Sequence, residues 1–159
     1  MASTQQNQRF TPQQALPKAK TYCAYQERCH SEVSDKLFGF GLNKEAVDKI
    51  ISQLIEENFL NEERFAIAFT GGHFRTKQWG RVKIKYELKK KQVSEYCVKK
   101  ALASINSVDY SKTLFRLADK KILTLKNEKN IFTKRKKLSD FLLQKGYESN
   151  LIREIINDL

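Results

Sequence analysis

One pattern of apolar residues occurs three times along this chain, and it limits the possible folds more than any other feature. When Leu42, Val93 and Tyr147 are aligned, apolar residues recur nine and five positions before them and five, eight and nine positions after them. These spacings are typical of one face of a helix rather than of a strand. The aligned residues are Val33, Leu37, Val47, Ile50 and Ile51, then Ile84, Leu88, Val98, Ala101 and Leu102, then Leu138, Leu142, Ile152, Ile155 and Ile156. We therefore expect three copies of one helical unit.

The stretch RVKIKYEL, residues 81–88, alternates basic and apolar residues, which taken alone is typical of a half-buried strand. Its counterparts in the other two copies, SEVSDKLFGFG and KLSDFLLQKG, do not alternate. We therefore predict that this stretch is also a helix, with Ile84 and Leu88 facing inward and most of its lysines facing solvent.

Each copy is expected to contain a leading helix, a short second helix, a tight turn and a third helix. In the first copy, Gly41 can take the positive φ that ends the second helix, and Asn43 can cap the third. The same two places are held by Gln92 and Ser94 in the second copy and by Gly146 and Ser149 in the third.

The leading helices are predicted over roughly 12–26, 61–76 and 109–125. Asn61 is a suitable N-cap for the second of these, because Glu62 and Glu63 follow it and acidic residues stabilise a helix N-terminus. Gly71 and Gly72 lie inside the same helix, where each costs about 1 kcal/mol relative to alanine. The two glycines therefore favour a kink or an early end at this point.

The chain is thus predicted to be all-α. Two prolines and six glycines in 159 residues leave few breaks, which favours helices over the frequent turns of a β-sandwich or barrel. Short helices cannot each bury an apolar face alone, so the units are expected to stack into an elongated, curved array. The expected division is a flexible tail over 1–10, followed by three-helix repeats over 11–60, 61–106 and 107–159.

Composition argues against a membrane, exported or metal-binding protein. No window approaches 18 consecutive apolar residues, and the start MASTQQNQRFTPQQ lacks the apolar core of a signal peptide, so we expect a cytoplasmic protein. Three cysteines fit a reducing compartment, and Cys23, Cys29 and His30 are too irregularly spaced for a zinc knuckle. No nucleophile elbow, phosphate-binding glycine loop or HExxH motif occurs. We expect no enzymatic activity, no metal and no cofactor.

The net charge of +12 belongs to the middle and the end of the chain. Residues 1–60 hold seven basic and seven acidic side chains, residues 61–100 hold eleven and four, and residues 101–159 hold twelve and seven. Between Arg75 and Lys91 there are eight Lys and Arg residues and one acid, Glu87. A field of this kind attracts nucleic acid, an anionic membrane or an acidic protein, although a basic helix face can also serve only to keep a protein soluble.

The candidate binding residues follow this charge. Trp79, near Phe74 and Tyr86, could stack on unpaired bases, or it could pack between units beside Gly80. Arg28 and Arg64 each lie near the start of a unit, where a salt bridge between helices is as plausible as a partner contact. The predicted partner-binding residues are Arg64, Arg75, Lys77, Arg81, Lys83, Lys85, Lys89 and Lys90.

Three segments together resemble the RecX family of bacterial regulators of the recombinase RecA. They are ERCHSEVSDKLFGFGL (27–42), NEERFAIAF (61–69) and WGRVKIKYELKKKQV (79–93). The resemblance covers roughly residues 13–104 well and the third unit loosely. The chain departs from the family pattern at Gln92, where glycine is frequent, and at Asn61, where an acid is usual. The matching residues are Arg28, Ser31, Lys36 and Leu37, then Glu62, Glu63, Arg64, Phe65 and Ala66, then Gly80, Arg81, Ile84, Glu87 and Leu88.

The resemblance implies tandem three-helix repeats that bind in the groove of the RecA filament on single-stranded DNA. Members of the family suppress the filament's ATPase and strand exchange and hinder its growth, so the implied role lies in recombination and DNA repair. We expect a monomer whose basic second unit, with part of the third, touches the filament and DNA phosphates directly. Two other classes stay open: a helix-turn-helix-like protein that binds DNA by itself, and a helical scaffold for another acidic protein.

Overall fold

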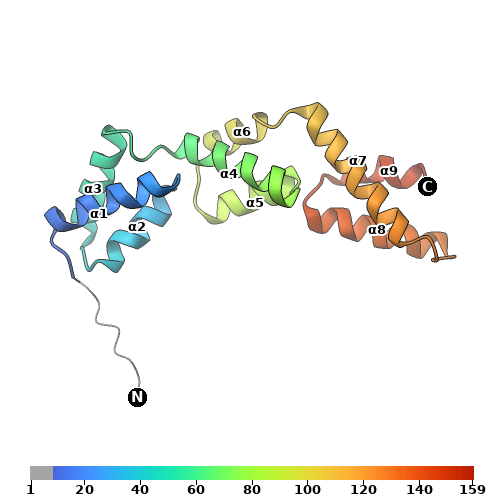
Figure 1. Ribbon diagram of the computed structural model, residues 1–159, viewed down its shortest axis with the longest axis horizontal. Helices are drawn as coiled ribbons and strands as arrows, with labels where there is room; N and C mark the ends of the chain where they lie inside the picture. The colour runs from blue at the N-terminus through green and yellow to red at the C-terminus, as the bar shows by residue number, and fades with distance from the viewer. Residues whose placement is uncertain (1–8) are drawn as a thin grey trace, which may run out of the picture.

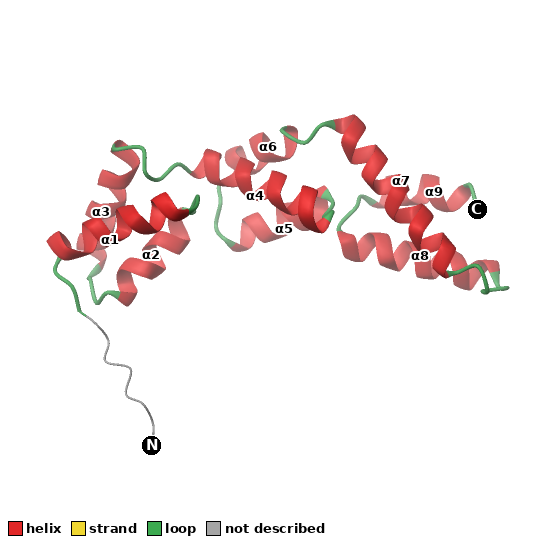
Figure 2. Cartoon of the chain, in the orientation of Figure 1, coloured by secondary structure: helices red, strands yellow, loops and turns green. Residues whose placement is uncertain are grey.

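The computed structural model describes residues 9–159, and helices are its regular structure throughout that range (Figure 1, Figure 2). Three groups of three helices follow one another in an elongated, curved array, which confirms the predicted fold class. The first unit holds α1 (Pro12–Tyr25), α2 (His30–Gly39) and α3 (Lys44–Glu56), the second α4 (Glu62–Lys77), α5 (Arg81–Lys90) and α6 (Glu95–Ala103), and the third α7 (Ser107–Thr124), α8 (Ile131–Lys145) and α9 (Ser149–Asn157). The expected tail lies mostly outside the described residues, and Phe10 packs on the first unit through its ring contact with Phe40.

The threefold apolar pattern forms the core, as predicted. The aligned residues from Val33 to Ile50, and their counterparts in the second and third units, are all buried. The last aligned row, Ile51, Leu102 and Ile156, is half-buried at the edge of the core. The alternating stretch 81–88 is helical, because Ile84 and Leu88 fall on one face of α5 and are fully buried.

The turns between second and third helices share one backbone conformation. Gly41, Gln92 and Gly146 have φ values of 84°, 63° and 96°, so glutamine adopts the left-handed conformation where the other units have glycine. Asn43 and Ser94 cap α3 and α6, as predicted. The predicted Ser149 cap is wrong. Glu148 is the N-cap residue of α9, and its side chain makes no capping bond because it binds Arg81 and Tyr110 instead.

The leading helices match their predicted ranges within two residues. Asn61 caps α4, accepting a hydrogen bond from the Arg64 amide at 2.9 Å. Gly71 and Gly72 neither kink nor end this helix, which continues to Lys77 because its inner face packs on α6. α7 begins at Ser107 rather than at residue 109, because the Asn106 side chain accepts bonds from two amides of its first turn.

The buried residues form two clusters rather than three. The first unit has its own cluster, whereas the second and third units share one that extends from Phe65 to Ile155. Cys29, at the start of α2, belongs to the shared cluster and links the first unit to it. The second and third units are therefore one continuous hydrophobic body.

Gly80 and Gly146 bring the second and third units into backbone contact. The Gly80 amide donates to the Lys145 carbonyl at 2.8 Å, and the Val82 amide donates to the Gly146 carbonyl at 2.9 Å. A Cβ atom on Gly80 would lie 2.3 Å from the Gly146 carbonyl oxygen, so no larger residue fits at this position without displacing the backbone.

Replacing Gln92 with glycine is expected to stabilise the protein by about 0.5–1 kcal/mol. The left-handed conformation costs a residue with a side chain, such as Gln92, about 1–2 kcal/mol, and glycine removes this cost. The greater backbone entropy of glycine in the unfolded chain offsets part of the gain. Urea unfolding measures the difference. Gln53→Gly, inside α3, is the control and should lose about 1 kcal/mol. Equal losses for both variants would contradict the assigned backbone conformation.

Gly80→Ala is expected to destabilise the shared core of the second and third units by about 2–3 kcal/mol, the typical cost of overpacking. Gly72→Ala is the matched control, because no atom lies within 4 Å of its added Cβ and alanine favours the helix. Thermal unfolding of both variants is the measurement. A neutral Gly80→Ala would show that the two units do not meet at this contact.

Candidate functional site

The solvent-facing side of α5 is both basic and apolar. Lys85, Lys89 and Lys90 are exposed on it, and between them Val82 and Tyr86 are 53% and 62% exposed. Because Ile84 and Leu88 anchor the opposite side in the core, the helix presents this face as a fixed surface. We call these five exposed residues the α5 face. Lysines beside an aromatic ring can contact phosphates or carboxylates while the ring supplies apolar contact area.

Two further predicted residues lie at the end of α4. Lys77 is exposed, and its Nζ lies 5.0 Å from the centre of the Trp79 ring. Arg75 is also exposed, with its guanidinium folded across Gly71. Arg75 lines a shallow groove together with Lys112 and Arg116 of α7, so the positive surface continues from the second unit onto the third.

Trp79 packs inside the second unit rather than projecting as a free stacking platform. Its ring is half-buried and stacks on His73 with ring centres 4.5 Å apart. Phe69 lies behind it at 6.5 Å, and Lys83 Nζ lies 4.8 Å from its centre. The ammonium groups of Lys77 and Lys83 thus lie close to the Trp79 ring, and cation–π attraction to the ring stabilises their positions.

Arg81 and Lys83, two predicted binding residues, face the third unit. Arg81 Nη1 donates to Glu148 Oε2 at 3.0 Å, and its guanidinium stacks 3.8 Å from the ring centre of Tyr110. Lys83 Nζ reaches the Gln144 carbonyl at 3.5 Å. The side chains of Arg81 and Lys83 thus connect the second and third units. Their role in partner binding stays a prediction.

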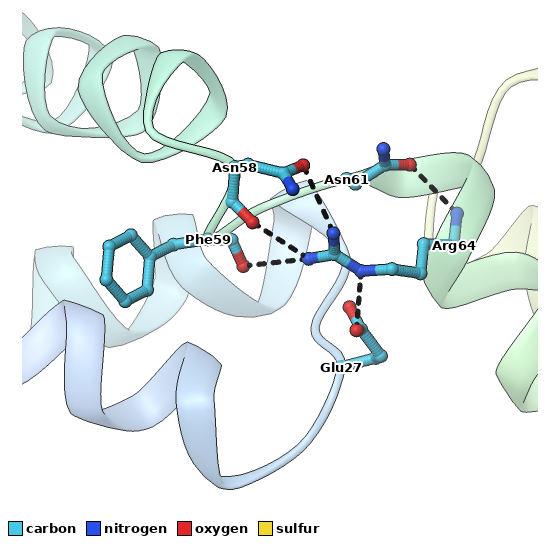
Figure 3. A network of polar contacts seen from close by, with 5 residues as sticks. All are labelled: Glu27, Asn58, Phe59, Asn61 and Arg64. Carbon is cyan, nitrogen blue, oxygen red and sulfur yellow. Dashed lines mark hydrogen bonds and ion pairs between the residues drawn. The ribbon is translucent and has the colours of Figure 1, made fainter.

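Arg64 also makes a contact between units, in this case between the first and the second (Figure 3). Its Nε donates to Glu27 at 2.5 Å, and its two terminal nitrogens bond Asn58 and Phe59 at distances of 3.1 to 3.4 Å. The structure thus shows a salt bridge between units at Arg64, and the role of Arg64 in partner binding stays a prediction. Arg28 makes internal contacts as well, bonding the Tyr22 carbonyl and stacking on its ring.

Buried tyrosines complete the contact between the second and third units. Tyr110 accepts a hydrogen bond from the Arg81 amide at 3.1 Å and donates to Glu148, and Tyr147 donates to the Gln78 carbonyl at 2.9 Å. Burial raises the pKa of both hydroxyl groups well above the usual range, and the neighbouring Glu148 carboxylate raises them further. Both phenols therefore stay neutral at physiological pH.

The five predicted residues that remain exposed, Arg75, Lys77, Lys85, Lys89 and Lys90, thus share one unit but lie on two helices. Sequence reasoning missed Val82 as part of this surface, because an apolar residue in an alternating stretch gives no sign of exposure. Within residues 9–159, no three His, Cys, Asp or Glu side chains gather as metal ligands, and no helix is long and apolar enough to cross a bilayer. The arrangement defines a helical-repeat protein with a basic surface suited to binding an anionic partner.

The chain belongs to the RecX family. The family's second three-helix domain matches residues 61–102 and its third matches residues 109–156. The chain is 30% identical to a protein named "Regulatory protein RecX" from Prosthecochloris aestuarii, in an alignment that covers 91% of this chain and 93% of that protein. It is 36% identical to a protein of the same name from Clostridium perfringens, in an alignment that covers 88% of this chain and 63% of that protein. The chain thus spans less than two thirds of the clostridial relatives' length. The family is one of regulatory proteins, and the resemblance noted from the sequence is confirmed.

Solved structures agree with this assignment. The crystal structure of RecX from Lactobacillus salivarius superposes with a TM-score of 0.82 at 26% identity, covering 93% of this chain and 96% of that one. A second crystal structure, titled regulatory protein RecX, has a TM-score of 0.78 at 22% identity and covers 93% and 74%, which supports the fold alone.

Folding stability is expected to fall steeply above pH 10 because of Tyr110 and Tyr147. Folding raises the pKa of each phenol above its unfolded value of about 10, so the neutral phenol contributes to folding stability. This contribution is complete below pH 10 and decreases as the pH rises above 10, because the unfolded state then loses the proton more readily than the folded state. Tyr110→Phe should therefore make the decline shallower by up to about 1.4 kcal/mol per pH unit. Urea unfolding between pH 9 and 12 measures this slope, with exposed Tyr86→Phe as the control. Identical slopes in both variants would contradict the burial of Tyr110.

Proposed function

We propose that this protein binds the RecA filament on single-stranded DNA and inhibits its ATPase, strand exchange and growth. Family membership supports a regulatory role, and the resemblance of the three sequence segments implies RecA as the partner. The single structural observation that carries the proposal is the α5 face, a rigid, basic and partly apolar surface at the centre of an elongated molecule.

The elongated shape suits a filament partner. A curved array of helical units offers an extended surface, and such surfaces engage partners over a long path. The shared core of the second and third units keeps the α5 face at a fixed orientation to α7, so the two can contact neighbouring protomers together. Bridging two protomers would oppose the changes in filament geometry that accompany ATP turnover and growth.

The contacts would be mostly electrostatic. Lys85, Lys89 and Lys90 can pair with acidic groups of the filament, and Tyr86 and Val82 add apolar area at the centre of the face. Exposed charge pairs are screened by salt, so inhibition should weaken steeply as ionic strength rises.

Reversing the charge of the α5 face is expected to abolish inhibition of RecA. The triple variant Lys85→Glu, Lys89→Glu and Lys90→Glu should raise the concentration for half-inhibition of ATP hydrolysis on single-stranded DNA at least tenfold, because attraction becomes repulsion. All three side chains are exposed, so the variant should fold.

The matched control reverses three exposed lysines of the first unit, Lys18, Lys44 and Lys49, for the same change in net charge. Unaltered inhibition by the α5-face variant would refute the proposed surface. Binding to free DNA is followed in parallel. Inhibition seen only once the DNA is saturated would favour the alternative function, a helix-turn-helix-like protein that binds DNA directly.

A further inference from the structure

The third unit contains an additional helical turn that its core does not require. α2 and α5 begin three residues before the aligned core residues Val33 and Ile84, whereas α8 begins seven residues before Leu138. The extension, residues 131–134, and the link from α7 therefore project beyond the repeat. Ile131 and Phe132 are 40% and 76% exposed, and neither belongs to the core cluster.

The same projection concentrates positive charge. Residues 120–137 hold eight Lys and Arg residues and one acid, Glu128, the same counts as in the slightly shorter stretch between Arg75 and Lys91. We call residues 120–137 the basic tip. It lies at the end of the molecule remote from the first unit (Figure 1). The eight basic residues are Lys120, Lys121, Lys126, Lys129, Lys134, Arg135, Lys136 and Lys137.

Internal contacts account for only part of this charge. Lys137 pairs with Glu128 at 3.4 Å, Lys136 pairs with Asp140 at 2.9 Å, and Arg135 bonds the Leu159 carbonyl. Lys121 Nζ lies 5.2 Å from the centre of the Phe141 ring. Among the described residues, Lys120, Lys126, Lys129 and Lys134 have no acidic partner within salt-bridge distance. Buried Leu125 attaches this link to the shared core, but the four lysines around it make no internal ion pair, so folding does not explain their charge.

We propose that the basic tip binds single-stranded nucleic acid, with Phe132 stacking on a base and the lysines around it contacting phosphates. An exposed aromatic ring within a basic surface is the combination that recognises unpaired bases, since every base offers a flat face to the ring. A duplex buries those faces, so Phe132 would find no partner there. The exposed apolar side chains of the tip, Leu123, Ile131 and Phe132, lie on two helices and are separated by the polar stretch 126–130, which favours a nucleic-acid strand over a lipid bilayer.

The proposal deepens the proposed function, on which it rests for its physiological role: a protein seated on a filament through the α5 face would reach the DNA strand with this tip. The two claims are nevertheless separable. Binding of the tip to a free strand requires no RecA, and inhibition of RecA is measured on its own.

The experiment measures binding of the 159-residue chain to a labelled oligothymidylate of about 20 nucleotides by fluorescence anisotropy at several salt concentrations. Phe132→Ala should weaken binding about five- to tenfold, and its effect should vanish on an abasic oligomer that keeps the phosphates but lacks the bases. The triple variant Lys126→Gln, Lys129→Gln and Lys134→Gln should weaken binding to both oligomers and lower the salt slope by about two, as expected for the loss of three phosphate contacts.

Matched controls test whether the location of the substituted residues matters, or only the loss of a ring or of three charges. Tyr25→Ala removes an aromatic ring of the first unit that is 83% exposed, and Lys18→Gln, Lys44→Gln and Lys49→Gln remove the same charge as the tip variant. The proposal is overturned if tip and control variants lose affinity equally. It is also overturned if the tip variants lose affinity for phosphatidylserine vesicles or for duplex DNA but bind the oligothymidylate as tightly as the unchanged protein does.

Assays of RecA ATP hydrolysis with the same variants keep the two proposals apart. Weakened strand binding with inhibition intact supports the tip as a DNA contact and places inhibition elsewhere. Full strand binding by the tip variants refutes the tip proposal whatever happens to RecA, and an inactive wild-type protein refutes only the proposed function.

Discussion

The close approach of two backbones at Gly80 and Gly146 fixes the arrangement of this molecule. Two amide–carbonyl hydrogen bonds cross between the units there, and Tyr110, Tyr147 and Arg81 close around them. Because the glycines leave no side chain between the units, their apolar residues merge into one core. The orientation of α5, and with it every exposed lysine on its outer face, depends on this contact.

The contact between the first and second units is of a different kind. Apart from buried Cys29, polar groups carry it: Arg64 with Glu27, the Ser31 hydroxyl with the Lys91 carbonyl at 2.7 Å, and Lys91 with Glu32 at 3.6 Å. Ion pairs that water can reach are screened by salt, whereas a buried apolar core is not. Salt should therefore loosen the first unit more readily than it separates the second from the third.

The repeat made the fold predictable, because residues that recur at helical spacing in three copies bury themselves in the same way. It corrected the one misleading segment, 81–88, whose local alternation indicates a strand. Caps that depend only on neighbouring residues, such as Asn43, Asn61 and Ser94, were also predictable. Ser149 failed as a cap because α9 already begins at this residue. Glu148, which precedes it, binds Arg81 of the second unit instead of capping, a contact that no local pattern reveals.

The sequence by itself determined the class of fold, the three units, the family and the region of positive charge, since these depend on spacing and composition. Only the tertiary structure decided which basic residues are free. Arg64 and Arg81 have the same charge as Lys85 and Lys89, yet the first two bind carboxylates of a neighbouring unit and the others face solvent. A charged residue's role depends on what folding places opposite it, and in this chain those partners are 37 and 67 residues away along the sequence.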